Sequence, residues 1–105
     1  MASRVTQKPR ALRLPVHKLY FDQIKSGDKR EEYRLATEYW QKRIEGKVFD
    51  QVVITHAYPS HSQTDRIITI PWRGYYRKII VHPHFGNVPT DVYAIRLSDH
   101  GDYYE

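Results

Sequence analysis

The sequence contains no cysteine, which excludes a disulfide framework, a thiol nucleophile and a thiolate zinc site. No apolar run approaches the roughly 20 residues that a membrane-spanning helix needs. Residues 1–13 also lack the hydrophobic middle of a secretory signal. We therefore expect a cytoplasmic protein without membrane association, whose fold depends on packing alone.

At 105 residues the chain is long enough for one domain with a single core. Its 17 Lys and Arg against 12 Asp and Glu give a net charge of +5, which suits a polyanionic partner such as RNA or a nucleotide. A basic surface that serves solubility alone explains the charge equally well. Nine tyrosines, three phenylalanines and two tryptophans offer surfaces on which bases can stack.

The hydrophobic pattern predicts three parts: a flexible basic arm at residues 1–13, a folded domain at 14–98 and a polar tail at 99–105. For the arm, an edge strand around residues 11–14 is the alternative. Within the domain we expect two helices and then mostly strands. The helices fall at 16–26 and 38–45, and the strands at 29–35, 48–58, 66–72, 75–82 and 92–97.

The continuous run Val52-Val53-Ile54 is typical of a central strand that is covered on both faces. The short link Arg73-Gly74 favours an antiparallel hairpin, in which Pro71 has to lie at an edge or a bulge. Trp40 is spaced with Ile44 as on one helix face, and we assign it to the core. The class is α+β, and the elements fit a small mixed barrel.

The most informative segment is Gly27-Asp28-Lys29-Arg30-Glu31-Glu32-Tyr33-Arg34, because a helix-ending glycine opens there into a highly charged strand. Alternation places Arg30, Glu32 and Arg34 on one face, and turns Tyr33 and Leu35 toward the core. Lys29 lies in the turn, where alternation does not fix direction, so it can converge on Glu32 and Arg34. A solvated ion-pair ladder on an edge strand is the structural alternative.

The spacing Gly27-x-Lys29-x-x-Glu32-x-Arg34, preceded by the segment 20–26, resembles the activating signal cointegrator homology (ASCH) domain. The resemblance extends from about Leu14 to Ser98. It includes Trp40 in a second short helix, Tyr58 after a hydrophobic strand, and a closing strand at 92–97. It implies a PUA-like mixed β-barrel of about five strands, with two short helices in the N-terminal half.

Some members of that family bind RNA, some are ribonucleases, and small bacterial members hydrolyse the acetyl amide of N4-acetylcytidine. The last group resembles this chain in size and uses a lysine, a threonine three residues later and a downstream glutamate. Lys29 matches the lysine, but Glu32 occupies the threonine position, and no glutamate stands in a strand between Gln51 and Leu97. Thr55 or Thr69 can supply the hydroxyl only through a rearranged geometry.

We expect the domain to bind RNA or a modified nucleotide in a cleft beside Lys29, Glu32 and Arg34. Tyr58 or Trp72 is expected to stack on a base, and Arg73 to contact the ligand. The aromatic and basic residues that alternate in the second half of the chain suit one shared rim of that cleft, and the alternative is that Trp72 and one of the tyrosines Tyr75 and Tyr76 pack inside the barrel. The alternating residues are Tyr58, Trp72, Tyr75, Tyr76, Arg66, Arg73, Arg77 and Lys78.

Two other functions stay open. One is a metal-independent hydrolase with Lys29 and Glu32 as catalytic residues, and the other is a protein-interaction module with an acidic partner. We expect neither a cofactor nor a metal, because His56, His61, His82 and His84 show no metal-binding spacing and read as loop or capping residues. His56 is the strongest exception, since it leads to Tyr58. We expect a monomer.

Overall fold

The computed structural model describes residues 8–60 and 62–98. Two helices and six strands within them confirm the α+β class, with one strand more than the five expected. The elements are β1 (Ala11–Val16), α1 (Lys18–Ser26), β2 (Glu31–Leu35), α2 (Glu38–Ile44), β3 (Gln51–His56), β4 (Ile67–Pro71), β5 (Tyr75–Ile80) and β6 (Thr90–Arg96), with short 3-10 turns η2 (Thr64–Arg66) and η3 (Pro83–Phe85).

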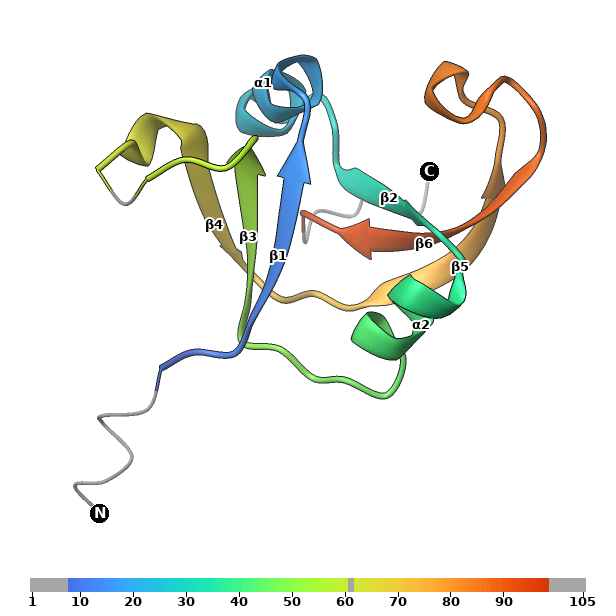
Figure 1. Cartoon of the computed structure of the whole chain (residues 1–105), viewed down its shortest axis with the longest axis horizontal. Coiled ribbons are helices and arrows are strands. Elements are labelled where there is room, and N and C mark those ends of the chain that lie inside the picture. Colours follow the sequence, from blue (N-terminus) through green and yellow to red (C-terminus); the bar gives the residue numbers. More distant parts are fainter. Residues whose placement is uncertain (1–7, 61, 99–105) are drawn as a thin grey trace.

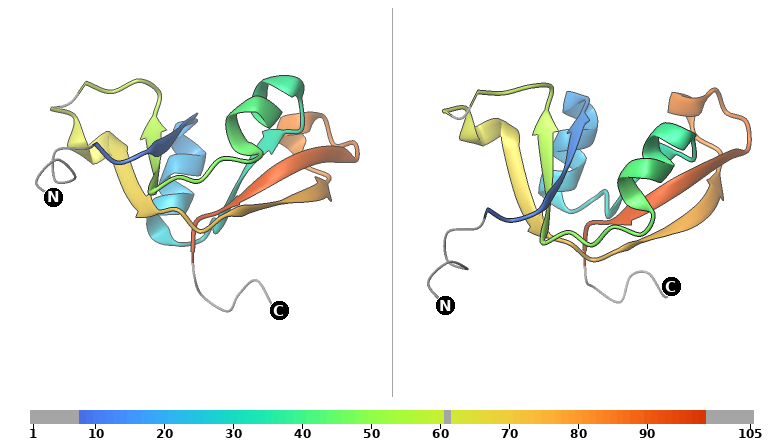
Figure 2. Two further views of the ribbon diagram at one scale, coloured as in Figure 1. Left: turned by 90° about the horizontal axis from the view of Figure 1, so that it is seen from below. Right: turned by 60° about the horizontal axis from the view of Figure 1, so that its bottom comes forward.

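The strands form two sheets of three. The first has the order β1-β3-β4, in which β1 runs parallel to β3 and β4 runs antiparallel to it. The second has the order β2-β6-β5 and is antiparallel throughout. No ladder between described strands joins the sheets into a closed barrel. β1 is the edge of the first sheet that lies toward the second sheet (Figures 1 and 2).

One predicted pairing is wrong: β4 and β5 do not form a hairpin, because each pairs within a different sheet. The link between them carries the chain from one sheet to the other. The Trp72 N–H donates to the Asp50 carbonyl beside the first sheet, and the Gly74 carbonyl accepts from Arg96 N–H of the second. Pro71 ends the edge strand β4, where its missing N–H breaks no ladder hydrogen bond, as expected.

Strand β1 decides between a flexible arm and an edge strand for the last residues of the predicted N-terminal arm. β1 includes the last residues of the range assigned to a flexible arm, so the edge-strand interpretation is the correct one for residues 11–13. Residues 1–7 and the predicted tail 99–105 lie outside the described residues. Neither helix of the described residues is long and apolar enough to cross a membrane.

One hydrophobic core is shared by both sheets and both helices. Strand alternation turns every second side chain of β1, β3 and β6 inward, and α1 and α2 add residues from their apolar faces. Its members are Leu12, Leu14, Phe21, Ile24, Ile44, Val52, Ile54, Tyr93, Ile95 and Leu97. β3 is central, and its segment 52–55 is buried throughout, which confirms the prediction from Val52-Val53-Ile54.

Strand β2 departs from the expected facing. Leu35 is 40% exposed and does not point into the core. Glu31 and Glu32, by contrast, are buried. Tyr33, which was also expected to face the core, is only partly buried, is not part of the core, and donates its hydroxyl to Glu31. Trp40 is partly buried and packs against the core, as the helical spacing predicted.

The central position of β3 predicts a large loss of stability for Ile54→Ala. Ile54 is fully buried, so its truncation leaves a cavity and should lower the free energy of unfolding by about 3 to 4 kcal/mol in urea denaturation. Ile79→Ala is the matched control, since Ile79 of β5 is 70% exposed and its loss should cost about 0.5 kcal/mol or less. Equal costs for the two variants would contradict the assigned core.

Candidate functional site

The turn before β2 places Lys29. Helix α1 ends at Ser26, and Gly27 adopts the left-handed conformation at φ +90°, which side chains with a Cβ rarely tolerate. The Gly27 N–H donates to the Ile24 carbonyl, and the Lys29 N–H donates to the Gln23 carbonyl. These bonds hold the backbone of Lys29 against the end of α1, directly ahead of the strand.

Lys29, Glu32 and Arg34 converge as predicted, and we call them the charged triad. Glu32 Oε1 lies 3.7 Å from Lys29 Nζ, and Glu32 Oε2 lies 2.9 Å from Arg34 Nη2. Their side chains are only 14%, 9% and 17% exposed. These are not solvated ion pairs, so the alternative of an exposed ladder on an edge strand does not fit.

The charged triad lines a cavity of about 530 Å³, the site cavity. This volume lies within the range of roughly 300–1,000 Å³ that is usual for small-molecule sites. Its walls come from both sheets: Glu32 and Arg34 from β2, Pro15 and Val16 from β1, and His56 from β3.

Arg34 fixes one wall of the site cavity by a contact across the sheets. Its Nη2 donates to the carbonyl of Pro15 in β1 at 2.7 Å and forms an ion pair with Glu32 Oε2 at 2.9 Å. Its guanidinium carbon lies 5.1 Å from the centre of the Trp40 ring, within cation–π range. Arg34 is therefore held on three sides, so a ligand meets it in a preset position.

Aromatic and imidazole rings form the other side of the site cavity. We call His17, Tyr20, His82, His84 and Phe85 the imidazole rim. Tyr20 lies edge-on to His84 at 5.7 Å, His17 lies 5.6 Å from His84, and His84 lies 5.0 Å from Phe85. Two segments that lie far apart in the sequence, 17–20 and 82–85, form this rim, and their spacing did not predict it.

His82 is a capping residue, as expected, and also faces the site cavity. Its Nδ1 accepts a hydrogen bond from the His84 N–H at 3.0 Å. Because Nδ1 accepts, the proton of the neutral ring belongs on Nε2, which then serves as a donor. His56 also lines the cavity, and its functional role stays a prediction. His61 lies outside the described residues.

A second, polar cavity of about 490 Å³ adjoins the first, and Lys29 and Tyr33 line both. Glu31 organises it. Glu31 Oε1 accepts from the Tyr33 hydroxyl at 2.8 Å and lies 3.3 Å from Lys78 Nζ, while Oε2 accepts from the Tyr76 hydroxyl. Three side chains of the protein therefore hold this carboxylate in place.

The surroundings of Lys29, Glu31 and Tyr33 shift the pKa values of these three groups. Burial lowers the pKa of Lys29 from its ordinary value, and the charge of Glu32 only partly opposes this shift. Burial alone would raise the pKa of Glu31, but hydrogen bonds from Tyr76, Tyr33 and Lys78 outweigh it and lower the pKa. Burial and the Glu31 carboxylate raise the pKa of Tyr33 to about 12. Burial thus brings the Lys29 amine closer to its neutral state.

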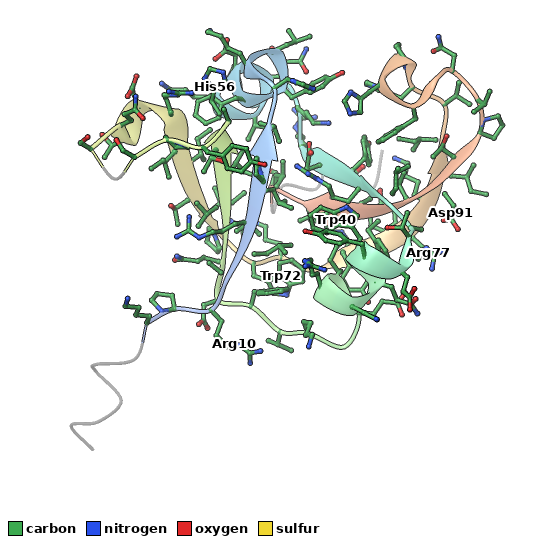
Figure 3. All side chains as sticks on the ribbon, in the orientation of Figure 1. Arg10, Trp40, His56, Trp72, Arg77 and Asp91 are labelled. Carbon is green, nitrogen blue, oxygen red and sulfur yellow. The ribbon has the colours of Figure 1, made fainter. Side chains whose placement is uncertain are left out.

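The structure does not bring all predicted site residues together. Tyr58 lines the site cavity and is 87% exposed. Trp72 and Arg73 are not among the residues that line it. Trp72 packs against Phe49 at 5.0 Å and against the core, at the opposite end of the first sheet from His56 (Figure 3).

The single aromatic and basic rim predicted for residues 58–78 is wrong. Tyr75 packs edge-on against Tyr93 in the core, and Tyr76 and Lys78 belong to the second cavity. Arg77 pairs with Asp91 on the second sheet, and Arg66 donates to the His56 carbonyl. The reason is the change of sheet after β4, which separates residues that are close in sequence.

Neither candidate hydroxyl reaches the charged triad. Thr55 is buried, donates to the Ala57 carbonyl at 2.8 Å, and does not line the site cavity. Thr69 lies on β4, which contributes no residue to that cavity. Glu32 is the one carboxylate among the residues that line it.

Within residues 8–60 and 62–98, no group of three His, Asp or Glu side chains is arranged to hold a metal ion. Comparisons with protein-family models, with curated proteins and with solved structures find no match to this chain.

The two pKa shifts predict that Lys29 loses its proton at a lower pH than Lys78. The pKa of Lys29 is lowered, whereas burial of Lys78 is outweighed by Tyr33 and Glu31, so that its pKa is raised. An NMR titration of the lysine 13Cε resonances should show Lys29 losing its proton first. In Glu32→Gln the Lys29 pKa should fall further, since the opposing charge is gone. A rise of the Lys29 pKa in that variant would contradict the assigned contact.

Glu31 predicts a stability difference that depends on pH. Because the pKa of Glu31 is lowered in the folded protein, its carboxylate stabilises the fold fully above the ordinary pKa of 4.5. This stabilisation is lost as the pH falls through the lower pKa of the folded state. Glu31→Gln should therefore cost about 2 kcal/mol near neutral pH, with the gap closing toward pH 3. Glu38→Gln, at an exposed carboxylate, is the control and should change stability by about 0.5 kcal/mol or less. Urea denaturation at several pH values measures the difference in the free energy of unfolding between the unmodified chain and Glu31→Gln. A difference that stays constant across this range would refute the stabilising role of Glu31.

Proposed function

We propose that the chain binds RNA or a modified nucleotide, with a nucleobase seated in the site cavity. The observation that carries the proposal is the charged triad, a nearly buried carboxylate held between an ammonium and a guanidinium in a cavity of about 530 Å³. Burying charges is costly unless they are paired. These three charges pair with one another and still line an accessible cavity, which suits a ligand that adds further polar contacts.

The three side chains suit different edges of one ligand. Glu32 uses one oxygen for Arg34 and holds Lys29 at a longer distance, and a carboxylate has further acceptor positions for the amino group of a base. Lys29 and Arg34 are donors for carbonyl or phosphate oxygens. Tyr58 and the imidazole rim, which includes Tyr20, supply flat faces for stacking.

The fold and the motif together support membership of the ASCH family, which we propose on the resemblance around Lys29, Glu32 and Arg34. Two sheets that share one core, with two helices in the N-terminal half, are compatible with a partly open PUA-like barrel.

Hydrolysis is the second candidate, and one observation favours it. Lys29, whose pKa is lowered, lies 3.7 Å from a carboxylate inside the cavity, and such pairs perform acid–base chemistry. In this version Glu32 takes a proton from a water that attacks the acyl carbon of an N4-acylated cytidine or the phosphorus of an RNA phosphodiester, and Lys29 stabilises the developing oxyanion. The C–N or P–O bond then breaks, and the leaving amine or alkoxide takes the proton back from Glu32. The lining contains no threonine or serine that could form a covalent intermediate.

Binding measurements on two variants test the proposal. Lys29→Met and Glu32→Gln each remove one charged contact and should weaken the affinity for 5′-mononucleotides and N4-acetylcytidine by roughly 10- to 100-fold. Lys42→Met and Glu38→Gln are the matched controls, because both residues are exposed and pair with each other on α2. The controls should bind as the unmodified chain does.

The same incubations distinguish the two candidates. Product formation from N4-acetylcytidine or from a short RNA, lost in Glu32→Gln while binding is largely kept, would identify a hydrolase. Binding without turnover supports the recognition function. If calorimetry shows that neither Lys29→Met nor Glu32→Gln differs from its control, the site cavity is not the ligand site.

A further inference from the structure

A third hollow of about 670 Å³ lies beside the site cavity, and we call it the arginine groove. It is enclosed by β1, β2, α2 and the segments after α2 and β3, and its lining includes Arg13, Arg34, Arg43, Tyr39, Phe49 and Tyr58. It shares Pro15, Arg34, Trp40 and Tyr58 with the site cavity. Because these four residues line both hollows, the arginine groove lies directly next to the site cavity.

The charge of the groove has one sign. Three arginines line it, and its lining includes neither Asp nor Glu. Arg13 lies on β1 between the buried Leu12 and Leu14, so strand alternation turns it outward. Such a surface attracts an anion that is extended along the groove.

Arg43 is held in place within the groove by its own helix. Its guanidinium carbon lies 3.5 Å from the centre of the Tyr39 ring, and its Nη1 donates to the Tyr39 carbonyl at 3.1 Å. An arginine that is stacked and hydrogen-bonded in this way loses less freedom when it binds a phosphate.

Exposed aromatic rings accompany these charges. Tyr39 is 54% exposed and Tyr58 is 87% exposed, while Trp40 and Phe49 are partly buried in the walls. Tyr39 and Trp40 contact each other edge-on at 5.1 Å. Arginines interleaved with aromatic rings are typical of surfaces that bind single-stranded nucleic acid, where phosphates meet the charges and bases stack on the rings.

We propose that the arginine groove binds the nucleotides that adjoin the one in the site cavity, so that the ligand is a single strand of nucleic acid and not a free nucleotide. This inference rests on the proposed function of the site cavity. Arg34, Trp40 and Tyr58, which face both hollows, then lie at the junction between the seated base and the rest of the strand.

An acidic peptide is the competing occupant, because it too would meet three arginines. Pairing of a peptide with the open edge of β1 is disfavoured by Pro15, which has no N–H to donate. The position of the groove next to the site cavity and the exposed rings of Tyr39 and Tyr58 favour nucleic acid.

The test compares a labelled single-stranded RNA octamer with 5′-mononucleotides, using Arg43→Gln and Arg13→Gln. Each variant should weaken octamer binding about fivefold and reduce the slope of log affinity against log salt by about 0.7. Mononucleotide affinity should stay unchanged, because neither residue lines the site cavity. Lys42→Gln is the control: Lys42 precedes Arg43 on α2, is 71% exposed and does not line the groove.

The outcomes separate this inference from the function on which it rests. If Arg43→Gln and Arg13→Gln bind the octamer as Lys42→Gln does, while Lys29→Met still weakens mononucleotide binding, the groove inference is wrong and the site cavity stands. If a polyglutamate peptide binds in an Arg43-dependent manner and the octamer does not, the groove is a peptide site. If Lys29→Met leaves mononucleotide binding unaltered, the proposed function itself fails.

Discussion

Arg34 connects the two sheets, and the arrangement of the whole site depends on this connection. A single amino group, Nη2, forms an ion pair with the Glu32 carboxylate within the second sheet and donates a hydrogen bond to the Pro15 carbonyl of the first. The Trp40 ring of α2 covers the same guanidinium. The three contacts define the boundary shared by the site cavity and the arginine groove, and they hold Glu32 where Lys29 can reach it. These three contacts within the protein explain why a charged group is tolerated with so little exposure.

The two carboxylates of β2 show how neighbours in sequence acquire different roles. Alternation sends Glu31 to one cavity and Glu32 to the other. Glu31 is surrounded by Tyr33, Tyr76 and Lys78, all of which stabilise its charged form, and it serves the fold. Glu32 has Lys29 at a longer distance and faces an open volume, so it retains acceptor capacity for a ligand. Lys29 lines both cavities, and burial weakens its hold on its proton.

Local signals in the sequence were sufficient for local features. The β-branched run 52–54 identified the central strand, and Gly27 with the charged spacing identified both the turn and the convergence of Lys29, Glu32 and Arg34. The failures concern long-range placement. Nothing in the Arg73-Gly74 link reveals that its flanking strands pair with β3 and β6, so the hairpin and the shared rim around Trp72 were both wrong. The imidazole rim and the arginine groove combine residues from distant segments, which only the packing of the two sheets brings together.

The central claim is that a nucleic-acid ligand enters the hollow where the charged triad lies. The most direct measurement is an NMR titration of the chain with a short single-stranded RNA, following the 13Cε resonance of Lys29 and the 15Nε resonances of the arginines. Arg77, whose guanidinium pairs with Asp91 away from both hollows, serves as the internal reference. Saturable shifts of Lys29 and Arg34 with an unmoved Arg77 are the predicted result. Shifts at Arg77 with Lys29 and Arg34 unchanged would contradict it.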